Sequence, residues 1–195
     1  MARPRGVDDL AILRAATQVM GRVGPAGFTL AAVAREVALV PATLTQRFGS
    51  KRGLLVALAD RTVEDIGELI ARVRAVHEGA LDALASLIAE WTAAMDTPET
   101  FAHHLAFWCA DLGDPELYER ALTVHRAQTE AILGLLTEAV AAGELRPGTD
   151  AAALARTVQV VIAGTGVTWA VVREGGLAQR LRQELDTALS PHVPA

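Results

Sequence analysis

The sequence predicts an all-α protein, and three observations support this prediction. Apolar residues recur at helical spacing along most of the 195 residues, and no segment alternates as a half-buried strand does. Hydrophobic residues make up 51% of the chain, but aromatic residues only 4%, so alanine, leucine and valine must fill the core. This composition favours helices over a sheet. The length suits one large domain or two small ones.

The first three predicted helices lie within the first 50 residues. The first covers Asp8–Val23, and the second starts after Thr29, whose hydroxyl can cap its free N–H groups. Residues 38–40 (Ala-Leu-Val) form a turn of the length that a helix-turn-helix needs. Pro41 suits the first position of the next helix, which Leu44 and Phe48 anchor inward.

The outward face of this third helix carries no carboxylate. Its residues are small, polar or cationic: Ala42, Thr43, Thr45, Gln46 and Arg47. A face that donates hydrogen bonds and avoids negative charge suits the major groove of DNA.

The rest of the chain is predicted as longer helices. Ser50 can cap a helix that covers Lys51–Val76 and is long enough to link a head to a body. The later helices are expected at 81–95, 99–112, 115–142, 150–173 and 177–189, with a plain loop at 143–148. Phe101, Leu105, Trp108 and Leu112 form one apolar stripe.

Charge is distributed unevenly. Residues 1–55 carry eight Lys and Arg against three acidic residues, a net charge of +5, which leaves −10 for the remainder of a chain whose net charge is −5. A basic head on an acidic body is the asymmetry expected of a DNA-binding head attached to a sensor body.

Other features suggest a soluble, cytoplasmic protein. The N-terminus lacks the apolar core of a signal peptide. The most apolar run, Val158–Val172, is 15 residues long, short of the roughly 20 residues that span a membrane, and it contains three polar side chains. It is predicted to be a buried helix. Cys109 is the single cysteine, which excludes an intrachain disulfide.

Residues 12–58 resemble the DNA-binding domain of TetR-type transcriptional regulators. The matching positions include Ile12, Ala15-Ala16, Gly24, Phe28-Thr29, Val33-Ala34, Thr43-Leu44, Phe48, Ser50-Lys51 and Leu54-Leu55. Two segments depart from the family. It usually has Gly-Val-Ser in the turn at 38–40 and Leu-Tyr-x-His-Phe at 44–48, where this chain has Leu-Thr-Gln-Arg-Phe. The resemblance implies a helix-turn-helix DNA-binding domain at 1–52 and a helical ligand-binding and dimerisation domain at 53–195.

The resemblance also implies roles for individual residues. Thr43, Gln46 and Arg47 would face base edges, with Ala42 on the same face. Thr29, Thr45 and Lys51, together with Arg5, would hold phosphates. The last two helices would form a homodimer interface in which Val161 and Trp169 are buried. The alternative is that the apolar helix is buried within its own chain.

A small-molecule site is expected in the middle helices, where aromatic residues occur beside a few polar ones. The candidates are Trp91, Met95, His104, Phe107, Trp108, His125, Gln128, Thr165, Thr168 and Trp169. Ordinary core packing is the alternative for each aromatic residue. The absence of Lys and Arg from this set suggests a mostly apolar effector.

Neither a metal site nor a cofactor is expected. Adjacent histidines on a helix point about 100° apart, so His103 and His104 do not form a ligand pair, and no catalytic set stands out. The sequence therefore predicts a ligand-responsive regulator that binds a palindromic operator as a homodimer, with repression the family's common mode. Two alternatives stay open: a DNA-binding regulator without an effector, and a small helical enzyme with a vestigial head.

Overall fold

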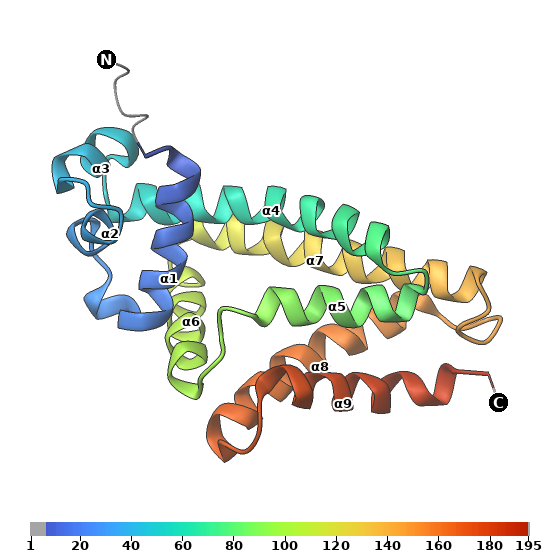
Figure 1. Ribbon diagram of the computed structural model, residues 1–195. Helices are drawn as coiled ribbons and strands as arrows, with labels where there is room; N and C mark the ends of the chain where they lie inside the picture. Colours follow the sequence, from blue (N-terminus) through green and yellow to red (C-terminus); the bar gives the residue numbers. More distant parts are fainter. Residues whose placement is uncertain (1–6, 195) are drawn as a thin grey trace.

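The computed structural model describes residues 7–194, and within them the chain is all-α, as predicted, with no strand. The elements are α1 (Asp9–Gly27), α2 (Leu30–Glu36), α3 (Pro41–Phe48), α4 (Lys51–Val76), α5 (Ala80–Thr92), α6 (Pro98–Asp111), α7 (Pro115–Ala141), α8 (Ala151–Val172), α9 (Leu177–Leu189) and the 3-10 turn η1 (Ser190–His192). Helices α1 to α3 gather at one end of the molecule, and the longer helices extend away from them (Figure 1).

The helix starts in the head follow local capping signals. The Asp8 carboxylate accepts a hydrogen bond from the Ala11 N–H at 2.8 Å and caps α1. The Thr29 hydroxyl caps α2 by accepting from Ala32 N–H at 3.0 Å, as predicted. These side chains satisfy N–H groups that have no partner inside the helix.

The turn between α2 and α3 is strained and lacks a cap. Ala38 has a φ of 53°, in the left-handed region that favours glycine. Val40 occupies the N-cap of α3, offers no side-chain hydrogen bond and is exposed. Ala38 and Val40, which stand where the family usually has Gly and Ser, therefore each cost local stability.

Restoring these two residues is expected to stabilise the head. Val40→Ser adds a hydroxyl at the N-cap, a change that contributes about 0.5–2 kcal/mol in other helices. Ala38→Gly relieves roughly 1–2 kcal/mol of left-handed strain, offset in part by the greater freedom of glycine in the unfolded chain. Urea unfolding of each variant would measure the gain. A lowered midpoint for Val40→Ser would contradict the assigned cap position.

The hydrophobic core of the head is completed by residues from outside it. Buried side chains of α1 to α3 pack with Leu54 of α4 and Phe107 of α6. The rings of Phe28 and Phe107 meet edge to face, with centroids 5.3 Å apart. The head therefore rests on the first turn of α4 and on α6. The predicted division at residues 52 and 53 stays a prediction.

Helices α4 and α7 run side by side in the same direction. Arg52 pairs with Asp114 near their first turns, Arg120 with Asp60 further along, and Arg74 with Glu138 near their ends. Figure 1 shows α4 leaving the head and continuing along the body beside α7. Surface ion pairs each contribute little energy, so their value here is to set the register of the two helices.

The core of the body lies between α4, α5, α7, α8 and α9. It contains Ile66, Leu69, Val73, Leu84, Leu87, Ile88, Ile132, Leu135, Leu136, Leu154, Val158, Trp169, Leu181 and Leu185. The segment at 143–148 is not a plain loop, because the Glu144 carboxylate accepts hydrogen bonds from the N–H groups of Ala80 (2.7 Å) and Leu81 (3.0 Å). It thereby caps α5, whose own N-cap residue, Gly79, has no side chain.

Helix boundaries differ from the predictions at a few ends. The bounds of α4 and α9 are as predicted. Helix α1 reaches Gly27 instead of Val23, with a break at Gly24, whose φ is 63°. Helix α5 ends at Thr92, short of the predicted Met95.

The apolar stripe of α6 is turned partly to solvent. Trp108 is 49% exposed and Leu112 50% exposed, while Phe107, which lies off the stripe, is buried. The reason is that α6 packs on α1 of the head and on α8 of the body along a different face. The helical spacing of apolar residues therefore did not predict which side chain of α6 is buried.

Helix α8 is buried along one face only. Thr165, Gly166 and Trp169 face the interior, whereas Val160 and Val171 are more than 70% exposed. The alternative, that this chain alone buries the helix, is wrong for that outer face. In the described part of the chain, α8 is also the one helix whose length and apolarity suit a membrane span. A core helix can satisfy the same criterion, so this is weak evidence.

Candidate nucleic-acid interface and effector region

The outer face of α3 is open, as the sequence predicts. Ala42, Thr45 and Gln46 are exposed, Thr43 is half-buried, and Leu44 is fully buried in the head. No residue of α3 carries a negative charge. The helix therefore presents hydrogen-bond donors and small side chains on a carboxylate-free surface.

Arg47 is engaged with the start of α1. Its guanidinium donates hydrogen bonds to the Val7 carbonyl at 2.6 Å and to the Asp9 carboxylate at 3.0 Å. The Asp9 side chain is 65% exposed, and such a pair contributes at most about 1 kcal/mol. A base or a phosphate could therefore displace Asp9, but Arg47 does not point freely outward as predicted.

Three of the four residues expected to hold phosphates also have partners within the head. The Thr29 hydroxyl caps α2, and the Thr45 hydroxyl donates to the Pro41 carbonyl at 3.2 Å. The Lys51 ammonium donates to the Pro25 carbonyl at 2.7 Å and lies 5.7 Å from the centre of the Phe28 ring. Arg5 lies outside the described residues. Contacts from these groups to DNA stay predictions.

Arg52 connects the head to the body. Its guanidinium binds the Asp114 carboxylate at 2.8 and 2.9 Å and also donates to Glu116. Hydrogen bonds from Arg52, and then from the backbone of α7, lower the pKa of Asp114 to about 2. The pair is charged at any pH the protein normally meets, so it ties the first turn of α4 to that of α7.

Two of the predicted effector residues lie between head and body. Phe107 is part of the head core, and His104 lies against Gly21 of α1. Beside them, the ring of His103 contacts the Gly21 carbonyl through Nδ1 at 2.7 Å.

A second group lies in the core of the body. Trp169 is 2% exposed, meets Phe101 edge to face at 6.3 Å and donates to the Gly175 carbonyl at 2.9 Å. This position corrects the expectation that Trp169 meets a partner subunit, because its ring is already covered. Trp91 and Met95 pack on the same core. The Trp91 Nε1–H is buried without a partner among the described residues.

The remaining predicted effector residues lie toward the surface. Trp108, His125 and Thr168 are exposed, Gln128 is half-buried, and Thr165 is buried on α8. The ten residues are therefore divided among the head–body contact, the body core and the surface. Their role in effector binding stays a prediction.

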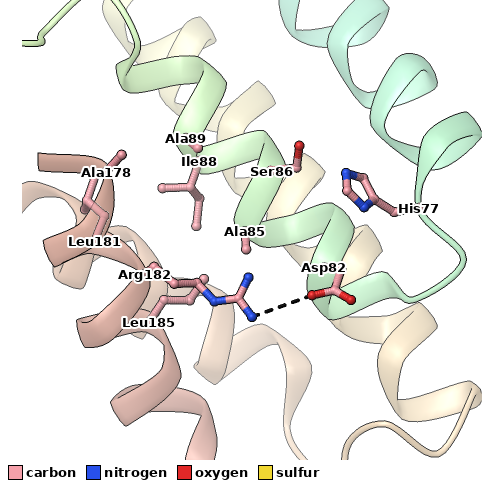
Figure 2. Close-up of a pocket in the computed structure, with 10 residues that line it drawn as sticks. All are labelled: His77, Asp82, Ala85, Ser86, Ile88, Ala89, Ala178, Leu181, Arg182 and Leu185. Atoms are coloured by element: carbon pink, nitrogen blue, oxygen red, sulfur yellow. Dashed lines mark ion pairs between the residues drawn. The ribbon is translucent and has the colours of Figure 1, made fainter. Parts of the chain in front are cut away.

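A groove between α5 and α9 was not foreseen from the sequence. Figure 2 shows Arg182 of α9 facing Asp82 of α5 across it, at 3.6 Å, with His77 at the far side. The cavity volume is about 400 Å³, and a neighbouring hollow of about 490 Å³ shares Arg182 and Leu185. None of the ten predicted effector residues lines either one.

The described residues contain no group of three or more His, Cys, Asp or Glu placed to hold a metal ion. Cys109 is exposed on α6.

Comparison with known proteins identifies the N-terminal segment. The family model for bacterial regulatory proteins of the tetR family matches residues 12–58, which cover most of α1, all of α2 and α3, and the start of α4. The HTH-type transcriptional regulator BetI of Stenotrophomonas maltophilia (strain R551-3) is 28% identical over 108 residues. Residues 12–58 therefore form a DNA-binding domain of the tetR family type.

The BetI match covers 54% of this chain and 55% of BetI, so it spans about half the length of either protein. Solved structures resemble nearly the whole chain in fold. A candidate transcriptional regulator from Saccharomonospora viridis, in complex with choline, has a TM-score of 0.73 at 20% identity over 94% of this chain and 96% of that one.

Two further structures have the same fold. A candidate TetR-family regulator from Rhodococcus sp. has a TM-score of 0.70 at 20% identity, covering 94% of this chain and 97% of that one. FadR from Bacillus subtilis, in complex with stearoyl-CoA, has a TM-score of 0.68 at 20% identity, covering 94% and 98%.

Three sets of contacts could not be predicted from the sequence of this protein. Asp9 holds Arg47, Arg52 is tied to α7, and His103 meets Gly21. The charge of Arg52 and the small size of Gly21 were visible in the sequence. Their partners lie 38 to 82 residues away along the chain, where no local pattern points.

Proposed function

We propose that this protein is a homodimeric, ligand-responsive transcriptional regulator in the cytoplasm, a repressor that binds a palindromic operator. The observation that carries the proposal is the exposed, carboxylate-free face of α3 within a helix-turn-helix unit of the TetR family. Such a helix suits the major groove, where donors on its first turns can reach base edges.

Dimerisation is supported by the outer face of α8. Val160, Ala163, Val167 and Val171 recur there at helical spacing and are exposed, with Gly164 beside them. Small residues allow a second helix to approach closely, and a two-fold partner would supply the same face. Two copies would present two α3 helices, as a palindrome requires.

Response to an effector is supported by two features. Two proteins of the same fold were solved with small molecules, choline and stearoyl-CoA. In this chain α4 and α6 each touch both the head core and the body. A ligand that favours one position of these helices would change the separation of the two heads, and a coupling of about 1–3 kcal/mol gives a 5–150-fold change in affinity. We propose a mostly apolar effector bound near Trp91 and Trp169.

Arg47→Ala is expected to weaken operator binding by about 1–3 kcal/mol and to relax the preference at one base pair, because a guanidinium commonly reads guanine.

Asp9→Asn releases Arg47 and is expected to tighten operator binding by up to about fivefold, since the exposed Arg47–Asp9 pair contributes no more than about 1 kcal/mol. Gel-shift titrations would measure both effects. Arg126→Ala, an exposed arginine on α7, is the control. If Arg47→Ala and Asp9→Asn both bound the operator with wild-type affinity, the placement of α3 in the major groove would be wrong.

Two measurements separate the alternatives. Tryptophan fluorescence titrated with a panel of hydrophobic compounds, in parallel with gel shifts, shows whether a bound ligand changes operator affinity. A compound that binds tightly but leaves the affinity for the operator unchanged would indicate a regulator without effector control. If the compound were recovered in a chemically altered form, the protein would instead be an enzyme.

A further inference from the structure

A tight contact between head and body is formed by two histidines of α6 against two glycines of α1. A Cβ atom at Gly24 would lie 2.7 Å from Cδ2 of His103, and one at Gly21 would lie 3.1 Å from Nε2 of His104. Neither position tolerates a larger residue without displacing an imidazole. The pair His103–His104 with Gly21 and Gly24 is called the histidine joint below.

The two imidazoles differ in their hydrogen bonding. His103 Nδ1 faces the Gly21 carbonyl at 2.7 Å, and a carbonyl only accepts, so Nδ1 carries the hydrogen and donates. His104 Nε2 is buried and has no hydrogen-bond partner among the described residues. A proton added there would place an unpaired N–H and a positive charge inside the contact.

We propose that the histidine joint is a proton-sensitive coupling between body and head, closed while His104 is neutral and opened by acidification, which lowers affinity for the operator. The effect on the operator rests on the proposed DNA-binding function. The opening of the joint does not, because it is a property of the free protein.

The surroundings of His104 support an opening of the histidine joint at low pH. Burial lowers the pKa of His104, and the charge of His103 lowers it further. The closed joint therefore binds fewer protons than the open one, so it loses stability as the pH falls below the ordinary histidine value of about 6.5.

Among the described residues, no ion pair includes His103 or His104. The ion pairs on the elements that pack against α6 join other residues: Arg22 with Glu36 and Asp9 with Arg47 for α1, Arg52 with Glu116, Arg120 with Asp60 and Glu116, and Arg74 with Glu138 for α7, and Arg173 with Glu99 at the end of α8. The contact on α1 is made of glycine and backbone.

The opening can be measured without DNA. The backbone amide resonances of Gly21 and Gly24 report on the joint directly. We expect them to shift more between about pH 7.5 and about pH 5.5 in the wild type than in His104→Gln, whose residue 104 is neutral at both values. His104→Leu, also neutral, serves if the glutamine variant folds poorly. Equal shifts in wild type and variant would overturn the proposal.

The consequence for the operator is measured over the same range. Wild-type affinity is expected to fall about fivefold or more at the lower pH, within the usual range of allosteric coupling, whereas His104→Gln keeps its affinity. His125→Gln, at an exposed histidine on α7, is expected to behave as wild type. Shifted glycine resonances with unchanged operator affinity would refute the coupling. If no form binds an operator, the proposed function fails, and the glycine resonances still decide whether the joint opens.

Discussion

Val160→Glu is expected to convert the protein to a monomer and to abolish operator binding. Val160 is 71% exposed in the single chain and lies in the outer face of α8, which we propose to be covered by a second copy. Each copy would then bury an unpaired carboxylate, at a cost of several kcal/mol. A monomer cannot engage two half-sites about 34–36 Å apart together. Sedimentation velocity at micromolar concentration, alongside gel shifts, measures both effects.

The matched control for this variant is Val76→Glu. Val76 is 70% exposed at the end of α4, so the two substitutions place the same charge at equally accessible valines. Val76→Glu is expected to remain dimeric, and circular dichroism should show both variants folded. A dimer in Val160→Glu, or a monomer in the unaltered protein, would refute the interface.

Gly53→Ala is expected to weaken operator binding at least tenfold and to lower the free energy of unfolding by about 1–3 kcal/mol or more. Gly53 lies in the first turn of α4, where its N–H donates to the Ser50 hydroxyl at 3.1 Å. A Cβ atom there would overlap the backbone carbonyl oxygen of Phe48, the last residue of α3. Backbone cannot move aside as a side chain can, so α3 must tilt against α4. Urea unfolding and gel shifts measure the two effects.

Gly67→Ala, in the same helix, is the control for Gly53→Ala. No atom lies within 4 Å of a Cβ at Gly67, which is exposed. Alanine should therefore stabilise α4 by about 1 kcal/mol through its greater helix propensity. If Gly53→Ala behaved like Gly67→Ala, the close approach of α3 to α4 would be disproved.

Features that depend on neighbours in the chain were predictable. Thr29 and Ser50 cap the helices that follow them, Pro41 begins α3, and the bounds of α4 are those expected. Each signal acts within about one turn of helix, since a cap bonds to an N–H two or three residues away. The family pattern at residues 12–58 is of the same kind, because it records the spacing of such signals.

Features that depend on distant parts of the chain were not predictable. Spacing pointed to Trp108 on α6, yet Phe107 is the residue buried, because Phe28 of the head meets it. Arg47 and Arg52 were visible as charges, but their partners on α1 and α7 were not. The predicted effector residues are divided among three regions, and the groove beside Arg182 was unforeseen. A helical pattern indicates which residues share a face, but only packing between helices far apart in sequence determines what that face meets.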